Sequence, residues 1–324
     1  MNTIQKNQVG IAGAAGYTGG ELLRILLNHP HVEIAWAHSR SHLNEQVAAV
    51  HTDLLGETNL CFSNPVWEKT DIVFLCMGHG ESKKYLLENS VPDHIRIIDL
   101  SQDFRLDDSW IYGLPEMNRD SIRKNTKHIA NPGCFATTIQ LALLPLAENR
   151  LLNDDIHVSA ITGSTGAGQA PSQSTHFSWR SHNISNYKSF EHQHLAEIGR
   201  SLSLLQPESN HRIQFIPYRG GFTRGILASI YTPIREDIQK VIDLYNRRYE
   251  SHPFVWVSPV PIDVKQVVNT NKCFLYLEKH GEMLLITSIT DNLLKGASGQ
   301  AVQNMNLLMG CEETAGLRLK STAF

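Results

Sequence analysis

Hydrophobic residues in the first half of the chain occur in short runs that alternate with amphipathic segments. Short apolar runs between turn residues are typical of buried strands, and apolar positions three and four residues apart are typical of helices. The alternation of the two predicts a doubly wound parallel sheet. The expected strands are residues 9–12, 32–37, 71–77, 95–100 and 127–130, and the expected helices are residues 21–28, 82–89 and 135–147.

The pattern changes after residue 150. Two strand-like runs, 272–279 and 282–290, flank His280-Gly281 and predict a hairpin, whose strands pair antiparallel. We therefore expect a second, α+β domain with a mostly antiparallel sheet. Its other expected elements are strands at 156–162, 212–217 and 225–232 and a helix at 236–249, and a last helix is expected at 297–309.

A glycine-rich turn follows the first expected strand. In the order strand, turn, helix, such glycines let the backbone approach a pyrophosphate at the helix N-terminus. The spacing GxxGxxG is less common than GxGxxG, and the pattern has weight only in this context. It predicts a Rossmann-type dinucleotide-binding domain, with cofactor ligands at Gly13, Gly16, Tyr17, Thr18 and Gly19.

The residues after the second strand favour NADP over NAD. An acid there would bond the ribose hydroxyls of NAD, whereas Ser39 and Arg40 offer a hydroxyl and a fixed cation that suit the 2′-phosphate of NADP. Arg40 can also be an ordinary solvated loop residue. Ser101 follows strand 95–100, whose end faces the same crevice, and we expect it to contact the cofactor as well.

A single cysteine stands where a helix ought to begin. The run Asn131-Pro132-Gly133-Cys134 separates strand 127–130 from helix 135–147. At a helix N-terminus the macrodipole and the unpaired N–H groups favour a thiolate, so we expect a pKa below the free value of about 8.5. The same N–H groups can hold an oxyanion. Cysteine is also among the most often buried residue types, so a plain core role is the alternative.

Composition is typical of a cytoplasmic enzyme. The chain has 324 residues, enough for about two domains, and a formal net charge of −3 gives no argument for nucleic acid or a membrane surface. Its five cysteines form no CxxC pair and no plausible disulfide framework, which points to a reducing compartment. The N-terminus lacks the apolar core of a signal peptide, and no apolar run is long enough to span a bilayer.

Five segments resemble the N-acetyl-γ-glutamyl-phosphate reductase family of arginine biosynthesis, and the resemblance spans nearly the whole chain. The cysteine box and the C-terminal run are its most specific parts. It implies an NADPH-dependent reduction of an N-acylated γ-glutamyl phosphate to the semialdehyde, with release of phosphate. The segments are AAGYTGGEL, IDLSQDFR, YGLPEMNR, NPGCFATT and NLLKGASGQAVQNMN.

The same resemblance implies a domain plan and a homo-oligomer, either a homodimer or a homotetramer. An NADP-binding domain of residues 1–133 is completed by residues 297–324, and residues 134–296 form the catalytic and oligomerisation domain. Cys134 would attack the acyl phosphate and form a thioester, which hydride from the cofactor then reduces. Asn292, in the C-terminal run, is assigned to the cofactor site.

The resemblance also supplies an acid or base. His192-Gln193-His194 resembles the motif HxHxPEI, with Ala196 in place of the proline. By motif position His192 is the acid/base and His194 the second candidate. A paired histidine motif can also bind a metal, but no further ligands complete a set, so we expect no metal.

Anion recognition is assigned to Arg224, Arg105 and the backbone around Gly166, in a loop that resembles the family's SGAG segment. Gln169 and Arg219 depart from the family pattern. They leave open an N-succinyl substrate, whose extra carboxylate Arg219 could bind. Two further protein classes stay open: aspartate-semialdehyde dehydrogenase, which uses the same cysteine chemistry, and a non-catalytic NADP-binding redox sensor in which Cys134 is oxidised.

Overall fold

The computed structural model describes residues 6–124 and 126–322, and these fall into two compact units. Unit 1 contains residues up to 132 together with residues 297–318, and unit 2 contains residues 133–296 together with the last described residues, 319–322. Asn269 Nδ2 donates to the carbonyl of Lys320 at 3.2 Å, a contact within unit 2. In the described part of the chain, every helix is too short or too polar to cross a lipid bilayer.

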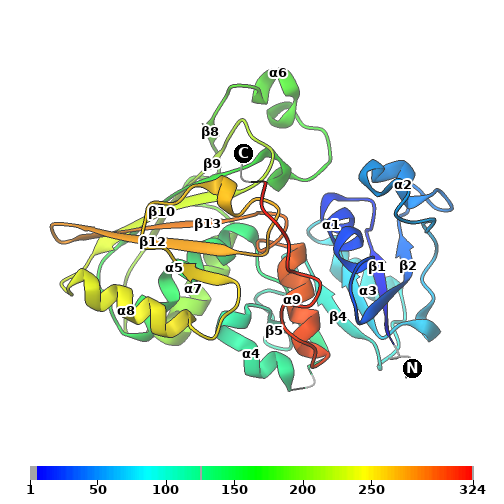
Figure 1. Ribbon diagram of the computed structural model, residues 1–324, viewed down its shortest axis with the longest axis horizontal. Coiled ribbons are helices and arrows are strands. Elements are labelled where there is room, and N and C mark those ends of the chain that lie inside the picture. Colours follow the sequence, from blue (N-terminus) through cyan, green and yellow to red (C-terminus); the bar gives the residue numbers. More distant parts are fainter. Residues whose placement is uncertain (1–5, 125, 323–324) are drawn as a thin grey trace. The chain divides into compact units, whose positions relative to one another are not determined.

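Unit 1 is built on a sheet whose described strands all pair in parallel, in the order β2-β1-β3-β4-β6-β5 (Figure 1). The four residues of β3 are all buried, as expected of a strand that is covered on both faces. The predicted parallel sheet of Rossmann type is confirmed. The strands are β1 Asn7–Ala12, β2 Val32–His38, β3 Ile72–Leu75, β4 Arg96–Asp99, β5 Ile111–Tyr112 and β6 His128–Ala130.

The C-terminal helix α9 is part of unit 1. All of its residues are buried, and it packs on α1, α4 and β4. Ser298 Oγ donates to the carbonyl of Thr18 at 2.8 Å, and Gln300 Nε2 donates to the carbonyl of Gly113 at 2.9 Å. The helices of this unit are α1 Tyr17–Leu26, α2 Val47–Val50, α3 Glu81–Glu88, α4 Pro115–Arg123 and α9 Ser298–Leu308, with short 3₁₀ helices at Thr52–Leu54 and Trp67–Lys69.

Helix α1 begins earlier than its expected start at residue 21. Gly19 and Gly20 are poor helix formers that masked its first turn in the sequence. In the structure a Cβ on Gly19 would lie 2.6 Å from Ala14, and one on Gly20 would lie 2.6 Å from the ring of His51. The glycines are therefore inside the helix because its first turn packs too closely for side chains.

Unit 2 is built on a mixed sheet with the order β11-β12-β13-β10-β7-β9-β8. Among the described strands, β11 with β12 and β7 with β9 pair in parallel, and the other four pairs are antiparallel, so the predicted mostly antiparallel sheet is confirmed. The strands are β7 Ile156–Thr162, β8 Ser185–Asn186, β9 Ile213–Arg219, β10 Ile226–Pro233, β11 Val255–Val257, β12 Cys273–His280 and β13 Met283–Thr290.

One face of this sheet is covered by helices of the same unit. Helix α5 contacts β10, β12 and β13, while α7 contacts β9 and α8 contacts β12. From Phe135 to Ala147 every residue of α5 is buried, which makes it the central element of the core. The helices are α5 Cys134–Glu148, α6 Phe177–Arg180, α7 His194–Leu205 and α8 Ile238–Tyr249, with 3₁₀ helices at Ser164–Ala167, Gln173–Thr175 and Val264–Gln266.

Candidate active site

The glycine turn after β1 has the geometry of a phosphate-binding turn. Gly13 has a φ of 82°, and a Cβ there would lie 2.7 Å from the carbonyl oxygen of Cys76. Gly16 is the extended N-cap residue of α1 and offers no side-chain cap, so the first N–H groups of the helix face the turn. The turn therefore brings bare backbone to a helix N-terminus, where an anion is stabilised.

A cavity of 280 Å³ opens beside this turn in unit 1. Gly13, Gly16, Ser39 and Arg40, four of the residues expected at the cofactor site, lie on its wall. Tyr17, Thr18, Gly19 and Asn292, expected at the same site, are not among its lining residues. Residues from the loop after β3 and from α3 complete the wall. The full lining is Gly13, Ala15, Gly16, His38, Ser39, Arg40, Cys76, Met77, Gly78, Glu81 and Tyr85.

Arg40 faces two carboxylates of α3. Its guanidinium lies 3.7 Å from Glu81 Oε2 and 3.5 Å from Glu88 Oε2, and all three side chains are about half exposed. Exposed pairs of this length contribute little, typically under about 1 kcal/mol. Arg40 is therefore held over the cavity by weak contacts that a more highly charged anion can replace.

Ser101 lies after β4 and is held by a buried carboxylate. Its Oγ donates to Asp99 Oδ2 at 2.7 Å and accepts from the N–H of Asp103 at 3.0 Å. Burial raises the pKa of Asp99, against the opposing effect of the hydrogen bonds from Ser101. The orientation of the Ser101 hydroxyl is thus fixed within unit 1, and the residues that line the cavity do not include it.

Arg105 is buried, and its guanidinium donates hydrogen bonds to backbone carbonyl groups. Its Nε donates to the carbonyl of Asn131 at 2.9 Å and its Nη2 donates to the carbonyl of Leu100 at 3.1 Å. Asn131 is also held by Asn304, whose Nδ2 donates to its Oδ1 at 3.1 Å. Arg105 therefore fixes the chain three residues before Cys134, a contribution beyond its predicted contact with substrate.

Helix α5 begins at Cys134, as the sequence predicts, and Gly133 is its extended N-cap residue. The N–H of Gly133 donates to Glu197 Oε2 at 3.2 Å. A Cβ on Gly296 would lie 2.8 Å from Cys134 Cβ, so the chain before α9 passes directly against the cysteine. Cys76, which lines the cavity of unit 1, has its pKa raised to about 12 by burial.

His192 and His194 are both buried beside the start of α5. Their ring centroids are 4.5 Å apart, and the ring of Phe135 packs edge-on against both. The N–H of His194 donates to His192 Nδ1 at 3.2 Å, so the neutral His192 ring carries its proton on Nε2. His194 Nε2 lies 3.9 Å from Glu197 Oε1.

A tyrosine and an arginine adjoin this cluster. Arg219 lies over the ring of Tyr187 at 4.5 Å, and Tyr187 packs edge-on against His192 at 5.8 Å. Burial, followed by the charge of Cys134, raises the pKa of Tyr187 to about 12. The cysteine, the histidines, Tyr187 and Arg219 thus form one cluster within unit 2.

Arg224 is paired rather than solvated. Its Nε donates to Asp291 Oδ2 at 3.0 Å and its Nη2 donates to Asp291 Oδ1 at 3.2 Å, a bidentate pair with a fully buried carboxylate. Asn292 joins the same loops, since its Oδ1 accepts from the N–H of Gly225 and its Nδ2 donates to Thr165 Oγ1. Gly166 lies next to Thr165 in the loop that Asn292 holds.

The comparisons with known proteins decide the family. The semialdehyde dehydrogenase NAD-binding domain matches residues 8–125, and the semialdehyde dehydrogenase dimerisation domain matches residues 134–292. An N-acetyl-gamma-glutamyl-phosphate reductase from Christiangramia forsetii is 53% identical over 98% of this chain and 99% of the relative. One from Parabacteroides distasonis is 53% identical over 97% and 99%. The chain belongs to the N-acetyl-γ-glutamyl-phosphate reductase family.

Solved structures of aspartate semialdehyde dehydrogenases have the same fold as this chain, although their sequence identity to it is low. Aspartate semialdehyde dehydrogenase II from Vibrio cholerae has a TM-score of 0.76 at 18% identity over 94% of this chain and 99% of its own. An aspartate semialdehyde dehydrogenase with NADP from Candida albicans has a TM-score of 0.71 at 13% identity over 94% and 99%. These neighbours confirm the two-domain fold, and the relatives above favour the reductase over the aspartate-semialdehyde dehydrogenase, the N-succinyl enzyme and the redox sensor.

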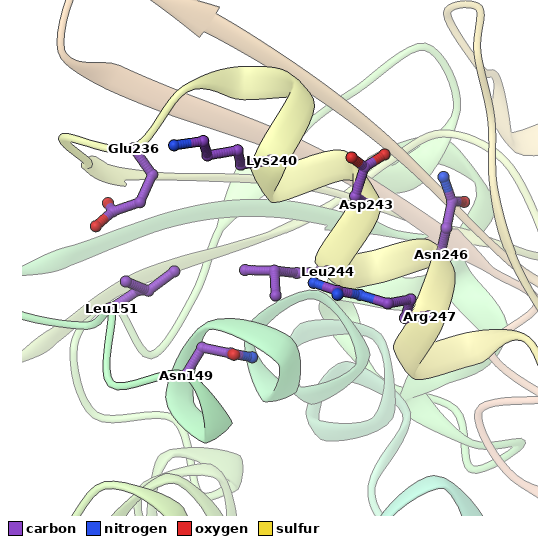
Figure 2. Close-up of a pocket in the computed structure, with 8 residues that line it drawn as sticks. All are labelled: Asn149, Leu151, Glu236, Lys240, Asp243, Leu244, Asn246 and Arg247. Atoms are coloured by element: carbon purple, nitrogen blue, oxygen red, sulfur yellow. The ribbon is translucent and has the colours of Figure 1, made fainter.

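Three residues of the candidate site, Glu197, Tyr187 and Asp291, were not predicted from the sequence. Glu197 belongs to the same HxHxPEI-like motif as His192, so a signal for it existed. Tyr187 and Asp291 had none, because each meets its partner only through folding. A larger cavity, of 630 Å³, lies between the end of α5 and α8 (Figure 2), but it is lined by none of the predicted site residues.

Proposed function

We propose that this chain catalyses the NADPH-dependent reduction of N-acetyl-γ-glutamyl phosphate to N-acetylglutamate 5-semialdehyde, with release of phosphate, in arginine biosynthesis. The observation that carries the proposal is the position of Cys134, the first residue of a buried helix beside His192, His194 and Glu197, in a chain about half identical to named reductases. A helix N-terminus is where a thiolate and an oxyanion are both stabilised.

Cys134 supplies the covalent step. Its thiolate attacks the carbonyl carbon of the acyl phosphate, and the N–H groups of the first turn of α5 stabilise the tetrahedral oxyanion. The carbon–oxygen bond to phosphate then breaks, phosphate leaves, and a thioester remains on Cys134. When bound, the dinucleotide supplies the hydride that reduces this thioester. The carbon–sulfur bond of the resulting thiohemiacetal then breaks, which releases the aldehyde and regenerates the Cys134 thiolate.

His192 is the proposed acid/base, and His194 is the second candidate. The Nε2–H of the neutral His192 ring can donate a hydrogen bond to the oxyanion that forms when the thioester is reduced, while Nδ1 accepts from the N–H of His194. Glu197 is a positioning residue, since it holds the N–H of Gly133 and lies near His194.

Substrate anions are assigned to Arg224, Arg105 and the backbone at Gly166. The pairing of Arg224 with Asp291 supports a fixed rather than a mobile guanidinium, which is suited to bidentate recognition of a carboxylate. Arg219, beside Tyr187, is a further cation near Cys134.

NADP is the proposed cofactor. A cavity that combines bare glycine backbone, a serine hydroxyl and the Arg40 cation fits a pyrophosphate and a 2′-phosphate. The residues that we propose as NADP ligands, within this cavity and outside it, are Gly13, Gly16, Tyr17, Thr18, Gly19, Ser39, Arg40, Ser101 and Asn292.

The chain carries a semialdehyde dehydrogenase dimerisation domain, and we propose a homodimer, or a homotetramer of two such dimers. The face of the unit 2 sheet opposite α5 supports this assembly. Along β7, β10, β12 and β13 buried residues alternate with partly exposed ones, and the partly exposed set mixes apolar residues with polar ones. The partly exposed apolar residues of these strands include Ile161, Leu227, Tyr231, Phe274, Tyr276 and Leu285.

We propose a cytoplasmic location, in keeping with five free cysteines.

The test is phosphate-dependent reduction of NADP⁺ with N-acetylglutamate 5-semialdehyde, which avoids an unstable acyl phosphate. The intact protein is compared with Cys134→Ser. Activity that requires phosphate and disappears in the variant is the expected result. Activity only with the N-succinyl substrate would redirect the assignment, and inactivity with both would overturn it.

A further inference from the structure

Tyr85 combines a buried ring with an unsatisfied hydroxyl. The side chain is on α3, is 3% exposed, and packs in the hydrophobic cluster that includes Val73, Leu75 and Ile97. Among the residues that the structure describes, none forms a hydrogen bond with Tyr85 Oη. A buried hydroxyl without a partner is unfavourable, and phenylalanine would fill the same core position without that penalty.

The same residue lines the nucleotide cavity with Ser39 and Arg40. Burial raises the pKa of Tyr85 to about 12, and the positive charge of Arg40 acts in the opposite direction. The phenol is therefore protonated at neutral pH and is available as a hydrogen-bond donor close enough to Arg40 to sense its charge.

Helix α3 also sets the position of Arg40. Glu81 and Glu88 of this helix both face the guanidinium at distances longer than a good hydrogen bond. Tyr85 lies four residues after Glu81 and three before Glu88, so the three side chains share one face of the helix. This face of α3 therefore carries the Tyr85 hydroxyl, a buried hydrogen-bond donor, and also the two carboxylates that face Arg40. Tyr85 and Arg40 both line the cavity.

We propose that the Tyr85 hydroxyl donates a hydrogen bond to the 2′-phosphate of the dinucleotide, beside Arg40, and so contributes to the choice of NADPH over NADH. The inference rests on the proposed NADP site and adds a ligand that the sequence did not suggest, since Tyr85 falls inside an expected helix and outside every motif. Among the polar groups of the dinucleotide, the 2′-phosphate is the one that Arg40 and Ser39 are placed to receive.

The test is Tyr85→Phe, which keeps the ring and removes only the hydroxyl. Dissociation constants for NADPH and NADH are measured by nucleotide fluorescence, and the thermal midpoint is measured without nucleotide. We expect NADPH binding to weaken about tenfold or more, the range for a hydrogen bond to a charged group, and NADH binding to change less than about twofold. The thermal midpoint should stay the same or rise, because a buried unsatisfied hydroxyl is removed.

Tyr245→Phe is the matched control. Tyr245 is also a buried tyrosine, but its Oη donates to the carbonyl of Ala142 in unit 2. That variant should lower the thermal midpoint and leave both nucleotide affinities unchanged.

Equal weakening of NADPH and NADH by Tyr85→Phe would overturn the 2′-phosphate assignment and place the hydrogen bond on a group that both nucleotides share. Unchanged affinities would overturn the inference entirely while leaving the proposed function in place. Failure of the unaltered protein to bind either nucleotide would overturn the proposed cofactor, and with it this inference.

Discussion

Glu197 accepts a hydrogen bond from the N–H of Gly133, with 3.2 Å between Oε2 and the nitrogen. Gly133 is the N-cap of α5 and precedes the cysteine, while Glu197 is in the first turn of α7 and is 3% exposed. The contact fixes the backbone at the N-terminus of α5 with a carboxylate from a helix 64 residues away in the chain. The position of Cys134 therefore depends on α7 as well as on its own helix.

Two substitutions of Glu197 distinguish its hydrogen bond to Gly133 from its negative charge. Glu197→Ala leaves the Gly133 N–H without its acceptor, and we expect a loss of about 1–3 kcal/mol in the free energy of unfolding and a lower kcat. Glu197→Gln keeps an acceptor oxygen and should recover most of both. The measurements are urea unfolding, single-turnover kinetics and the pH profile of Cys134 alkylation. If the glutamine variant is as impaired as the alanine variant, the charge is what matters, and the positioning role is wrong.

Gly296→Ala should displace the nucleophile. The added Cβ would lie 2.8 Å from Cys134 Cβ and 2.7 Å from the carbonyl oxygen of Asn292, so the backbone must shift. Overpacking of this kind costs about 1–3 kcal/mol, and a shift of about 1 Å at the reacting sulfur lowers kcat about 100-fold. Gly199→Ala is the control: it lies inside α7, where a Cβ meets no atom within 4 Å, and should stabilise the protein by about 0.5–1 kcal/mol. Wild-type kcat in Gly296→Ala would show that the contact is relieved without moving Cys134.

Glu88→Gln should strengthen NADPH binding. Glu88 Oε2 lies 3.5 Å from Arg40 Nη2 and competes with the 2′-phosphate for that cation. Removing an exposed partner of this kind is worth up to about fivefold in affinity, and less at high salt. Titrations of NADPH and NADH at two salt concentrations check the result. An equal gain for NADH, which has no 2′-phosphate, would contradict the competition.

His29 should make unit 1 sensitive to acid. Burial lowers the pKa of His29, whose Nε2 lies 3.0 Å from Asn306 Oδ1 and whose Nδ1 accepts from the N–H of His31. The unfolded chain protonates this ring near pH 6.5, so between that pH and the lower folded pKa the unfolded state binds more protons. The contribution of His29 to the free energy of unfolding should be constant above about pH 6.5. Below that pH it should fall by at most about 1.4 kcal/mol per pH unit.

Urea unfolding of the wild type and of His29→Gln between pH 5 and 8 tests this effect. The variant should lose part of the acid sensitivity. His280→Gln, at the exposed hairpin between β12 and β13, should retain all of it. A wild-type slope in His29→Gln would assign the acid sensitivity to other groups.

The sequence predicted the elements that carry their own periodic pattern. The long strands of both sheets and helices α5, α8 and α9 lie within a few residues of their expected ranges. The elements β5, β8 and β11 have only two or three residues each, too few to show a periodic pattern in the sequence. The equally short β6 was predicted because the Pro132-Gly133 turn marks its end. Helix α4 was missed as well: it begins at Pro115, is mostly polar, and bends at Asn118.

The candidate site follows the same division. Glycines, Arg40 and Cys134 stand beside strand ends and helix starts, so a local motif is enough to identify them. Asp291 and Tyr85 matter because of what they meet in space: a guanidinium from another strand end in one case, and a cavity wall in the other. No local pattern distinguishes such residues from ordinary core or turn residues.

The path of the chain through unit 1 has a consequence for synthesis. Helix α9 is entirely buried and packs on α1 and α4, yet the ribosome makes it only after residues 133–296 of unit 2. During translation the first 132 residues emerge with the apolar surface that α9 will cover still open to water. The nucleotide-binding unit is thus begun first and completed only near the end of synthesis. A chain that terminates before residue 297 contains all the strands of the catalytic unit but leaves the nucleotide-binding unit without α9.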